Sequence, residues 1–449
     1  NSTRKSIRLY DLDYDKDYIV VVVGVDEAGN ESTVDNLSWS TNNTIKFAVT
    51  QGLMKARSAV AAAFPTNNNL QPNDKGAAAL YWLAAGQTNS QGTYTNVTKE
   101  YDLIYWDSPS FQESASITWQ PVGTAKSNWF ADARGQDNPP RGNMRFYRAS
   151  YKDRWQRSRL VNGTNVTQRP LASEDVYAMH SVVLSEGYNY VALHGQPYTN
   201  TFAGVFGTDT SFWPASMTPA LATRVQFFSA GVNAPVAETY FFGNNGGWYK
   251  EGGTGSNVAD VPQDDDFFTR GFAIILPALG DYQTMTATDV ANTNSTVPAM
   301  MWHPVAKVPT NGPVNGTSFS HVISCGEINY PSKTEVYNVV ALNLPVAVHP
   351  SQMGLTNNPN TFRKGTRGFG DEIYTLNTST KGVLSGSTIY CDTAGVWRFV
   401  SNNGAVPWGH FRPNDVIVIV SRNGGVGSSW TWTYSPTNFY RLPTRWMGQ

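Results

Sequence analysis

The side chains that most often carry chemistry are spread through this chain without the spacings that catalysis or metal binding requires. The six histidines form no HxH or HExxH pair, so they are predicted to be packed or surface residues rather than metal ligands. No GxSxG or P-loop motif is present. A pair of catalytic carboxylates cannot be assigned from spacing alone. We therefore predict a protein that is not an enzyme and needs no cofactor.

The densest carboxylate cluster is the run Asp264, Asp265 and Asp266, which precedes two phenylalanines. Adjacent carboxylates could bind calcium, because this cation prefers oxygen ligands. The second copy of the repeat described below has Val406-Pro407-Trp408 at this place. A solvated turn is therefore the favoured interpretation, and no metal is predicted.

Trp248 and Trp397 are the best candidates for stacking against a sugar ring. Each follows a turn that contains glycine, and a tryptophan on a turn can present a flat apolar face to a ligand. Their equivalent placement in two parts of the chain also fits a shared role in a hydrophobic core, which we favour.

The two cysteines, Cys325 and Cys391, allow two interpretations. A disulfide is permitted if the chain is secreted, and two buried free thiols are equally compatible with the spacing.

The composition favours a β-rich extracellular protein. Charged residues make up 15% of the 449 residues, against about 25% in typical globular proteins. The sequence has no basic run of the kind that binds nucleic acid, and it has no stretch of 18 apolar residues that could span a membrane. The net charge of −1 opposes self-association only weakly.

Two similar hexapeptides reveal an internal repeat. YNYVAL at 188–193 recurs as YNVVAL at 337–342, which is 149 residues later. TYF at 239–241 and TIY at 388–390 keep that offset, and VQF at 225–227 matches IYT at 373–375 at an offset of 148. FTRGFAII at 268–275 is aligned with FRPNDVIV at 411–418. We expect residues 172–280 and 331–425 to be two copies of one β module, with Trp248 over Trp397 and Tyr188 over Tyr337.

Each copy is predicted to contain an alternating strand, a variable loop, a hairpin and a closing strand. The closing segments FAIIL and VIVIV are almost unbroken apolar runs, so we expect them to be buried on both faces. This plan resembles repeats of large, uncharacterised secreted proteins from environmental bacteria, with the match carried by 188–191 and 411–416. The resemblance implies a secreted β module and no known activity.

The chain begins with a segment that resembles the second half of a fibronectin type III domain. LYDLDYDKDYIVVVVGVDEAGNES at 9–32 has the tyrosine corner at Tyr18 and a β-branched strand after it. The resemblance covers about 40 residues, roughly half of such a domain. The missing strands would come from a longer precursor or from another chain.

The intervening residues are predicted to contain a helical connector. Val49, Leu53, Ala56 and Val60 fall on one face of a helix, and the segment ends at Pro65. The predicted fold is therefore mainly β: sandwich-like or barrel-like modules with a short helical connector. The half fibronectin-like segment is predicted to span 1–43, the connector 44–86 and a β unit 87–171. The first module is predicted to span 172–330 and the second 331–449.

These features together predict a secreted structural protein, the subunit of an extracellular filament, sheath or surface layer. An uncovered half sandwich would expose the run Ile19, Val20, Val21, Val22 and Val23, which could recruit another polypeptide, most simply a second copy of the chain. A carbohydrate-binding or adhesin protein, such as the accessory part of a glycan-degrading enzyme, is the alternative.

Overall fold

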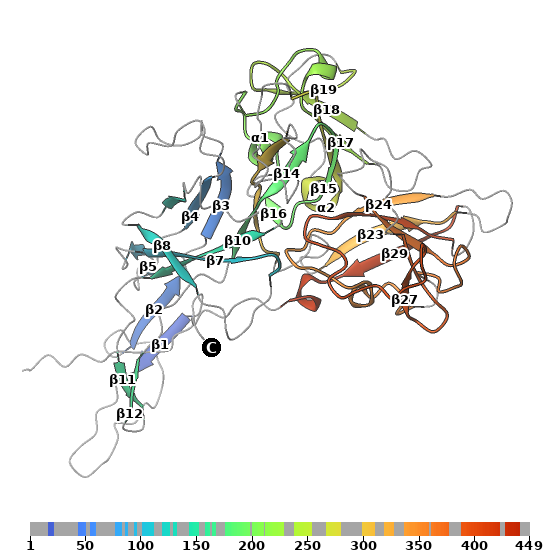
Figure 1. Cartoon of the computed structure of the whole chain (residues 1–449). Coiled ribbons are helices and arrows are strands. Elements are labelled where there is room, and N and C mark those ends of the chain that lie inside the picture. Colours follow the sequence, from blue (N-terminus) through green and yellow to red (C-terminus); the bar gives the residue numbers. More distant parts are fainter. Residues whose placement is uncertain are drawn as a thin grey trace, which may run out of the picture.

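The structure is a computed structural model of the whole chain, and it is mainly β, as the sequence predicts (Figure 1). The residues that it describes are 17–21, 44–50, 54–59, 77–82, 86–88, 94–96, 101–111, 119–125, 129–132, 143–151, 158–161, 164–167, 176–197, 200–210, 212–228, 238–253, 266–279, 299–309, 318–326, 336–358, 361–376, 388–422 and 427–440. Its strands form antiparallel sheets.

The predicted helical connector at 44–86 is wrong, because its described residues form strands. Ile45, Phe47 and Val49 alternate with small or polar residues, a period of two that suits a strand. Pairing with neighbouring strands outweighs the helix propensity of the alanines here, since propensity is a weak determinant in tertiary context. The first sheet has the order β1-β2-β5-β6 and the second β3-β4-β9. Their bounds are β1 Asp17–Val21, β2 Thr44–Thr50, β3 Met54–Ala59, β4 Ala77–Trp82, β5 Gly86–Thr88, β6 Tyr94–Asn96 and β9 Trp129–Asp132.

A six-stranded sheet joins the predicted β unit to the first module. Its order is β16-β22-β13-β10-β7-β8, so strands from both sides of residue 171 share one hydrogen-bonded ladder. A separate hairpin, β11–β12, lies in the sequence between β10 and β13. The bounds are β7 Tyr101–Ser108, β8 Gln120–Ala125, β10 Met144–Tyr151, β11 Ser158–Val161, β12 Thr164–Thr167, β13 Tyr177–His180, β16 Gln196–Pro197 and β22 Val305–Lys307.

Two five-stranded sheets, one from each predicted module, have the same strand order. The first is β15-β20-β17-β18-β19 and the second is β24-β28-β25-β26-β27. In each sheet, the strand that comes last in the sequence (β20 or β28) lies between the strands that come first and second. The bounds of the first sheet are β15 Gly187–Val191, β17 Arg224–Phe227, β18 Glu238–Phe242, β19 Trp248–Lys250 and β20 Phe272–Leu276. Those of the second are β24 Tyr337–Ala341, β25 Glu372–Thr375, β26 Ile389–Cys391, β27 Trp397–Phe399 and β28 Val416–Val420.

The registers of these sheets agree with most of the sequence offsets. Trp248 lies opposite Phe242, and Trp397 lies opposite Cys391, both at the offset of 149. The closing strands differ from the alignment by two residues. Since Asn189 pairs with Ile274 and Asn338 pairs with Ile419, the offset of these strands is 145 rather than 143.

A two-stranded sheet accompanies each five-stranded sheet. The first is β14 (Val182–Ser185) with β21 (Ala299–Trp302), and the second is β23 (Phe319–Ser324) with β29 (Ser429–Tyr434). The pairing of β23 with β29 places β23 in the second copy, although the predicted boundary at 331 lies after it.

A buried asparagine ties the two-stranded sheet to the five-stranded sheet in the first copy. Asn189 donates from Nδ2 to the backbone oxygens of Ser185 and Ile274, at 2.8 and 3.1 Å. Its Oδ1 accepts a hydrogen bond of 2.9 Å from the backbone N–H of Ser185. One side chain therefore substitutes for a missing strand-to-strand ladder.

The second copy has the same device. Asn338 donates to the backbone oxygens of Ser324 and Ile419 at 3.0 and 2.9 Å and accepts from the Ser324 N–H at 2.8 Å. We call these two residues the clamp asparagines. Ser185 and Ser324 are thus equivalent, at an offset of 139.

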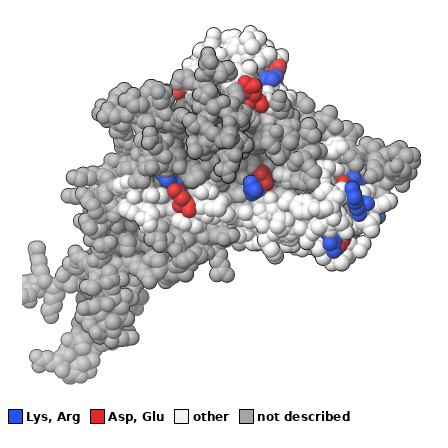
Figure 2. All heavy atoms as spheres, viewed as in Figure 1, with Lys and Arg blue, Asp and Glu red and all other residues white. Residues whose placement is uncertain are grey.

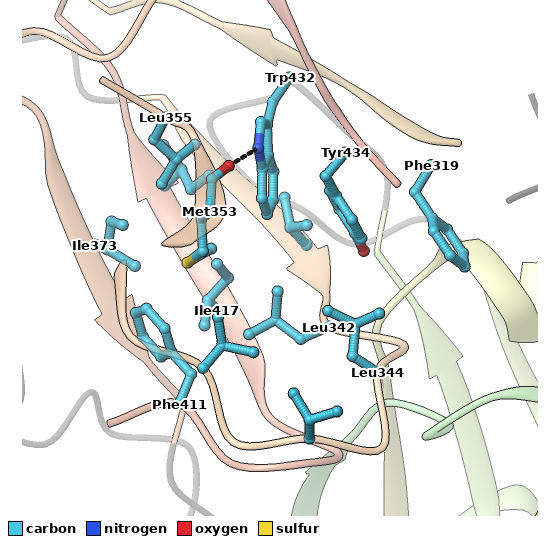
Figure 3. Close-up of a cluster of buried hydrophobic side chains, with 14 of the residues drawn as sticks. Phe319, Leu342, Leu344, Met353, Leu355, Ile373, Phe411, Ile417, Trp432 and Tyr434 are labelled. Carbon is cyan, nitrogen blue, oxygen red and sulfur yellow. Dashed lines mark hydrogen bonds between the residues drawn. The ribbon is translucent and has the colours of Figure 1, made fainter. Parts of the chain in front are cut away.

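Each copy has a hydrophobic core between its two sheets. In the first, aromatic rings dominate, and Phe202 stacks on Trp248 with 4.8 Å between ring centroids. In the second, the indole N–H of Trp432 donates to the Met353 backbone oxygen at 2.8 Å (Figure 3). The other labelled core residues of Figure 3 are Phe319, Leu342, Leu344, Leu355, Ile373, Phe411, Ile417 and Tyr434.

The helices among the described residues are short, and α1 contributes Phe202, Val205 and Phe206 to the core of the first copy. Thr201 caps α1 by accepting from the Gly204 N–H at 3.0 Å. Their bounds are α1 Phe202–Phe206, α2 Asp266–Thr269, η2 Pro219–Leu221, η3 Pro350–Met353 and η5 Pro436–Asn438.

We predict that Asn338→Ala destabilises the chain by about 2–4 kcal/mol, because it leaves buried backbone groups of Ser324 and Ile419 without their partner. Denaturant unfolding followed by tryptophan fluorescence measures this change. Asn357→Ala, at an exposed position, is the matched control. Equal stability of the two variants would contradict the clamp.

Candidate functional site

The two copies pack against each other through the outer faces of their five-stranded sheets. Tyr190 and Ala192 of the first copy cluster with Val339, Ala341 and Val416 of the second. This contact explains why β20 and β28 are buried on both faces, as their apolar sequences predict: one face meets its own core and the other meets the neighbouring copy. Figure 1 shows α2 and β15 beside β24 at this junction.

The residues that cluster across this junction occupy equivalent positions in the two copies. Ala192 and Ala341 are equivalent at the offset of 149, and they lie in one cluster. Gly271 and Val416 are equivalent at 145, and a Cβ on Gly271 would lie 2.8 Å from a methyl carbon of Val416. Contact between equivalent residues is the signature of a two-fold, isologous interface. The junction is therefore a pseudo-two-fold interface within one chain.

A cavity of about 440 Å³ opens at one end of this junction, and we call it the junction cavity. This volume lies within the range of small-molecule pockets, about 300–1,000 Å³. Both copies and the end of β7 contribute to its wall. The lining residues used below are His180, Ser181, Tyr190, Arg412, Pro413, Asn414 and Asp415.

Asn414 has an unusual position in this wall. Its φ of 74° lies in the left-handed region, which asparagine tolerates better than most residues. Its backbone oxygen accepts a hydrogen bond of 3.0 Å from the N–H of Ala192, which fixes the loop to the first copy. The side chain is 8% exposed, and neither its amide oxygen nor its amide nitrogen has a hydrogen-bond partner. Such a buried amide retains unused capacity to donate and accept.

Asp415 and Arg412 add opposite charges to the same loop. The Asp415 Oδ2 accepts from the Arg412 backbone N–H at 2.7 Å. Burial raises the pKa of Asp415 to about 7, and the hydrogen bond and positive charge of Arg412 offset only part of that effect. The carboxyl group therefore titrates near neutrality.

Ser181, which lines the cavity, lies beside a buried histidine. The Ser181 Oγ is 3.1 Å from the His303 Nδ1. Burial lowers the pKa of His303 to about 3, and that of nearby His194 to about 4. A general base works best with a pKa near the operating pH, so this pair is a structural hydrogen bond rather than a nucleophile with its base.

The densest buried polar network lies elsewhere, in the second copy. Asp371 accepts from Ser421 Oγ at 3.0 Å and from the Arg422 N–H at 2.6 Å. Arg422 also donates to Glu372 at 3.3 Å. Burial raises the pKa of Asp371 to about 6. Because its carboxyl oxygens are satisfied within the fold, this network holds strand ends together and offers no open binding position.

The structure does not support the two predicted sugar-stacking tryptophans. Trp248 is 2% exposed and Trp397 is 3% exposed. Each side chain turns inward to pack on a phenylalanine, Phe202 in the first copy and Phe362 in the second. The favoured core role explains their equivalent placement.

Of the two interpretations left open for the cysteines, the structure has the free thiols and not the disulfide. Cys325 and Cys391 are both buried free thiols. Cys325 lies 3.6 Å from the Ser421 Oγ, whereas Cys391 lies opposite Trp397 in the hairpin β26–β27. Burial raises the pKa of Cys391 to about 11, which keeps this thiol protonated and unreactive.

The other sequence candidates fall largely outside the described residues. Asp264 and Asp265 lie outside them, and Asp266 is described only as the backbone start of α2. No cluster of three potential metal ligands occurs among the described residues. Of the assembly run, Ile19, Val20 and Val21 lie in β1, whose partner is β2 of the same chain, whereas Val22 and Val23 lie outside.

Sequence reasoning missed Trp408, the most exposed large apolar side chain among the described residues. It is 75% exposed and packs against the ring of His349, with 4.5 Å between centroids. It adjoins Gly409, which lines the junction cavity. The available signal was that the first copy has Asp264-Asp265-Asp266 where this segment has an aromatic residue.

Charged side chains are sparse and scattered on the face shown in Figure 2, where the described part of the chain has no basic stripe. The described helices are also too short to cross a membrane.

We predict that Asp415→Asn stabilises the chain above pH 7 and leaves it unchanged near pH 4. Because the pKa of Asp415 is about 7 in the folded chain and 3.8 in the unfolded chain, its stabilising contribution is fully present below pH 3.8. That contribution is lost as the pH rises from 3.8 to 7, since the buried carboxyl group must then ionise. Thermal melting between pH 4 and 8 should show a gain on the order of a few degrees at pH 8. A variant that melts below the parent chain at pH 8 would contradict the assignment.

Searches of protein-family models, of curated proteins and of solved structures find no match to this chain.

Proposed function

We propose that this chain is a secreted structural protein that forms the subunit of an extracellular filament, sheath or surface layer. The observation that carries the proposal is the packing of two β modules into one unit through their outer faces. A structural subunit needs such stiffness, because flexible joints between modules would let a polymer bend or part.

Three kinds of contact make the joint between the copies stiff. Apolar side chains fill it, with Val339 of the second copy packed against a cluster of the first copy that includes Tyr190 and Phe228. Small residues such as Gly271 allow the sheets to approach closely. Hydrogen bonds cross it, including one of 2.9 Å from Asn343 Nδ2 to the Leu193 oxygen. Displacing one copy would break all three together.

The N-terminal sheet supplies the proposed joint between subunits. β1 is its edge strand, paired with β2 on one side and with no further strand among the described residues. An edge of this kind can be extended by a strand from a second copy. A head-to-tail contact is heterologous, so it propagates as a fibre unless it closes into a ring. The net charge of −1 would hardly oppose such stacking.

We expect the intact chain to form polymers visible by electron microscopy, and deletion of residues 1–41 to abolish them or change their geometry. The deletion removes β1 and the apolar run that includes Ile19 and Val21. Leu221→Ser, at an exposed position, is the control and should leave the polymers unchanged. An intact chain that light scattering shows to be a stable monomer would contradict the structural role.

Carbohydrate binding at a surface is a second candidate, and the exposed ring of Trp408 favours it. An indole ring offers a flat apolar face for a sugar, and the contact with His349 holds this ring in place. The segment that follows Trp408 in the sequence includes Arg412, an exposed cation that could donate to hydroxyl groups.

Under this second function, Trp408→Ala should reduce retention on insoluble polysaccharide at least tenfold. Pull-down on cellulose, chitin and an extracellular polysaccharide preparation would measure the bound fraction. Phe369→Ala removes another aromatic ring, 62% exposed, and serves as the matched control. Equal loss in both variants would indicate non-specific adsorption, and no loss in either would rule out the platform.

A further inference from the structure

We propose that the junction cavity binds a neutral saccharide of one or two sugar units, and that it arose by divergence of one half of a two-fold interface. A two-fold interface has two equivalent ends. Comparing these ends shows which residues opened the cavity.

Equivalences for the two-stranded sheets follow from the clamp asparagines. Since Ser185 corresponds to Ser324, His180 corresponds to Phe319. The pairing of β14 with β21 and of β23 with β29 then makes Trp302 equivalent to Trp432, and both are buried tryptophans. The offset of 145 for the closing strands makes Phe268 equivalent to Pro413.

One end of the interface is filled by aromatic rings. Phe268, from the first copy, reaches into the core of the second and packs on Phe319, with 4.9 Å between centroids. Phe319 in turn stacks on Tyr434 at 5.2 Å. All three side chains are buried, and at most 5% of any of them is exposed. The stacked rings therefore occupy the space at this end of the interface.

The other end has smaller or more polar residues at the same three positions. Pro413 occupies the position equivalent to Phe268, and His180 occupies that of Phe319. Pro304 occupies the position equivalent to Tyr434. Pro413 and His180 both line the junction cavity. The absence of these stacked rings thus accounts for the junction cavity. The pseudo-two-fold relation explains why the cavity lies at this end of the interface.

The wall of the cavity matches the chemistry of a sugar ring. Its apolar residues, among them Pro413, Val182 and the ring of Tyr190, suit the C–H faces of a pyranose. Asn414 lines the wall, and its amide has no partner within the protein. Both amide atoms are buried, so they can donate to and accept from a hydroxyl group once the side chain turns toward the cavity. Arg412 supplies donors and Asp415 supplies an acceptor. Their opposite charges favour a neutral ligand over a charged one.

This site rests on the second candidate function and is independent of the structural role. The junction cavity would bind a small soluble sugar or the end of a polysaccharide, whereas Trp408 would bind the surface of a polysaccharide. The two can therefore fail separately.

Isothermal titration of the full-length chain with glucose, galactose, mannose, N-acetylglucosamine, cellobiose and lactose tests the proposal. At least one should bind with one-to-one stoichiometry. The double variant H180F/P413F rebuilds the aromatic filling of the opposite end, so it should weaken that binding at least tenfold without lowering the melting temperature. Glucuronate and glucose 6-phosphate should bind no more tightly than glucose.

Arg412→Ala, at an exposed side chain, keeps the test decisive if the double variant fails to fold, and it should weaken the same sugar at least threefold. Phe369→Ala, which removes an exposed aromatic ring outside the cavity wall, is the matched control and should leave binding of the soluble sugar unchanged. Absence of binding by every neutral sugar at millimolar concentration would overturn the proposal. Binding that survives the cavity variants, or tighter binding of the charged sugars, would overturn it as well. If soluble sugar fails to bind while Trp408 still governs retention on polysaccharide, only the cavity assignment falls.

Discussion

Close approach between the outer faces of two β sheets is the constraint on which the rest of this structure depends. Small side chains allow the closest approach, as at Gly271, where an added Cβ would lie 2.8 Å from a methyl carbon of Val416. Ala192 and Ala341 extend the same strip. Because of this contact the closing strands must be apolar on both faces, and β20 and β28 are buried along their whole length.

The pseudo-two-fold relation connects packing with function. In a symmetric dimer both ends of an interface change together, because one gene encodes both. In a single chain each end can change alone. Here one end retains Phe268 against Phe319, whereas the other has Pro413 and His180 beside a cavity. One interface can thus hold the copies together at one end and offer a binding site at the other.

The polar groups buried in the two copies have distinct roles. The clamp asparagines are fully used in joining sheets, and Asp371 is fully used in holding strand ends. Asn414 is also buried, at 8% exposure against at most 1% for those three residues, yet its amide has no partner. A buried polar group without a partner costs free energy. That cost is the physical reason to associate Asn414 with a ligand and the others with stability.

The sequence by itself determined the β class, the duplication and the correspondence between most strands of the two five-stranded sheets, because strand periodicity and constant offsets can be read along the chain. It misread 44–86 as helix, since the alternation of Ile45, Phe47 and Val49 competed with a helical spacing that begins at Val49 and continues to Val60. It could not match β14 with β23, because the chain between each strand and its clamp asparagine is ten residues longer in the second copy, which changes the offset from 149 to 139. Only the tertiary structure decided that Trp248 and Trp397 face inward, that the cysteines are free, and that His180 and Pro413 meet at one cavity. Those outcomes depend on which sheet face meets which neighbour, and residues more than 200 positions apart carry no local signal of that choice.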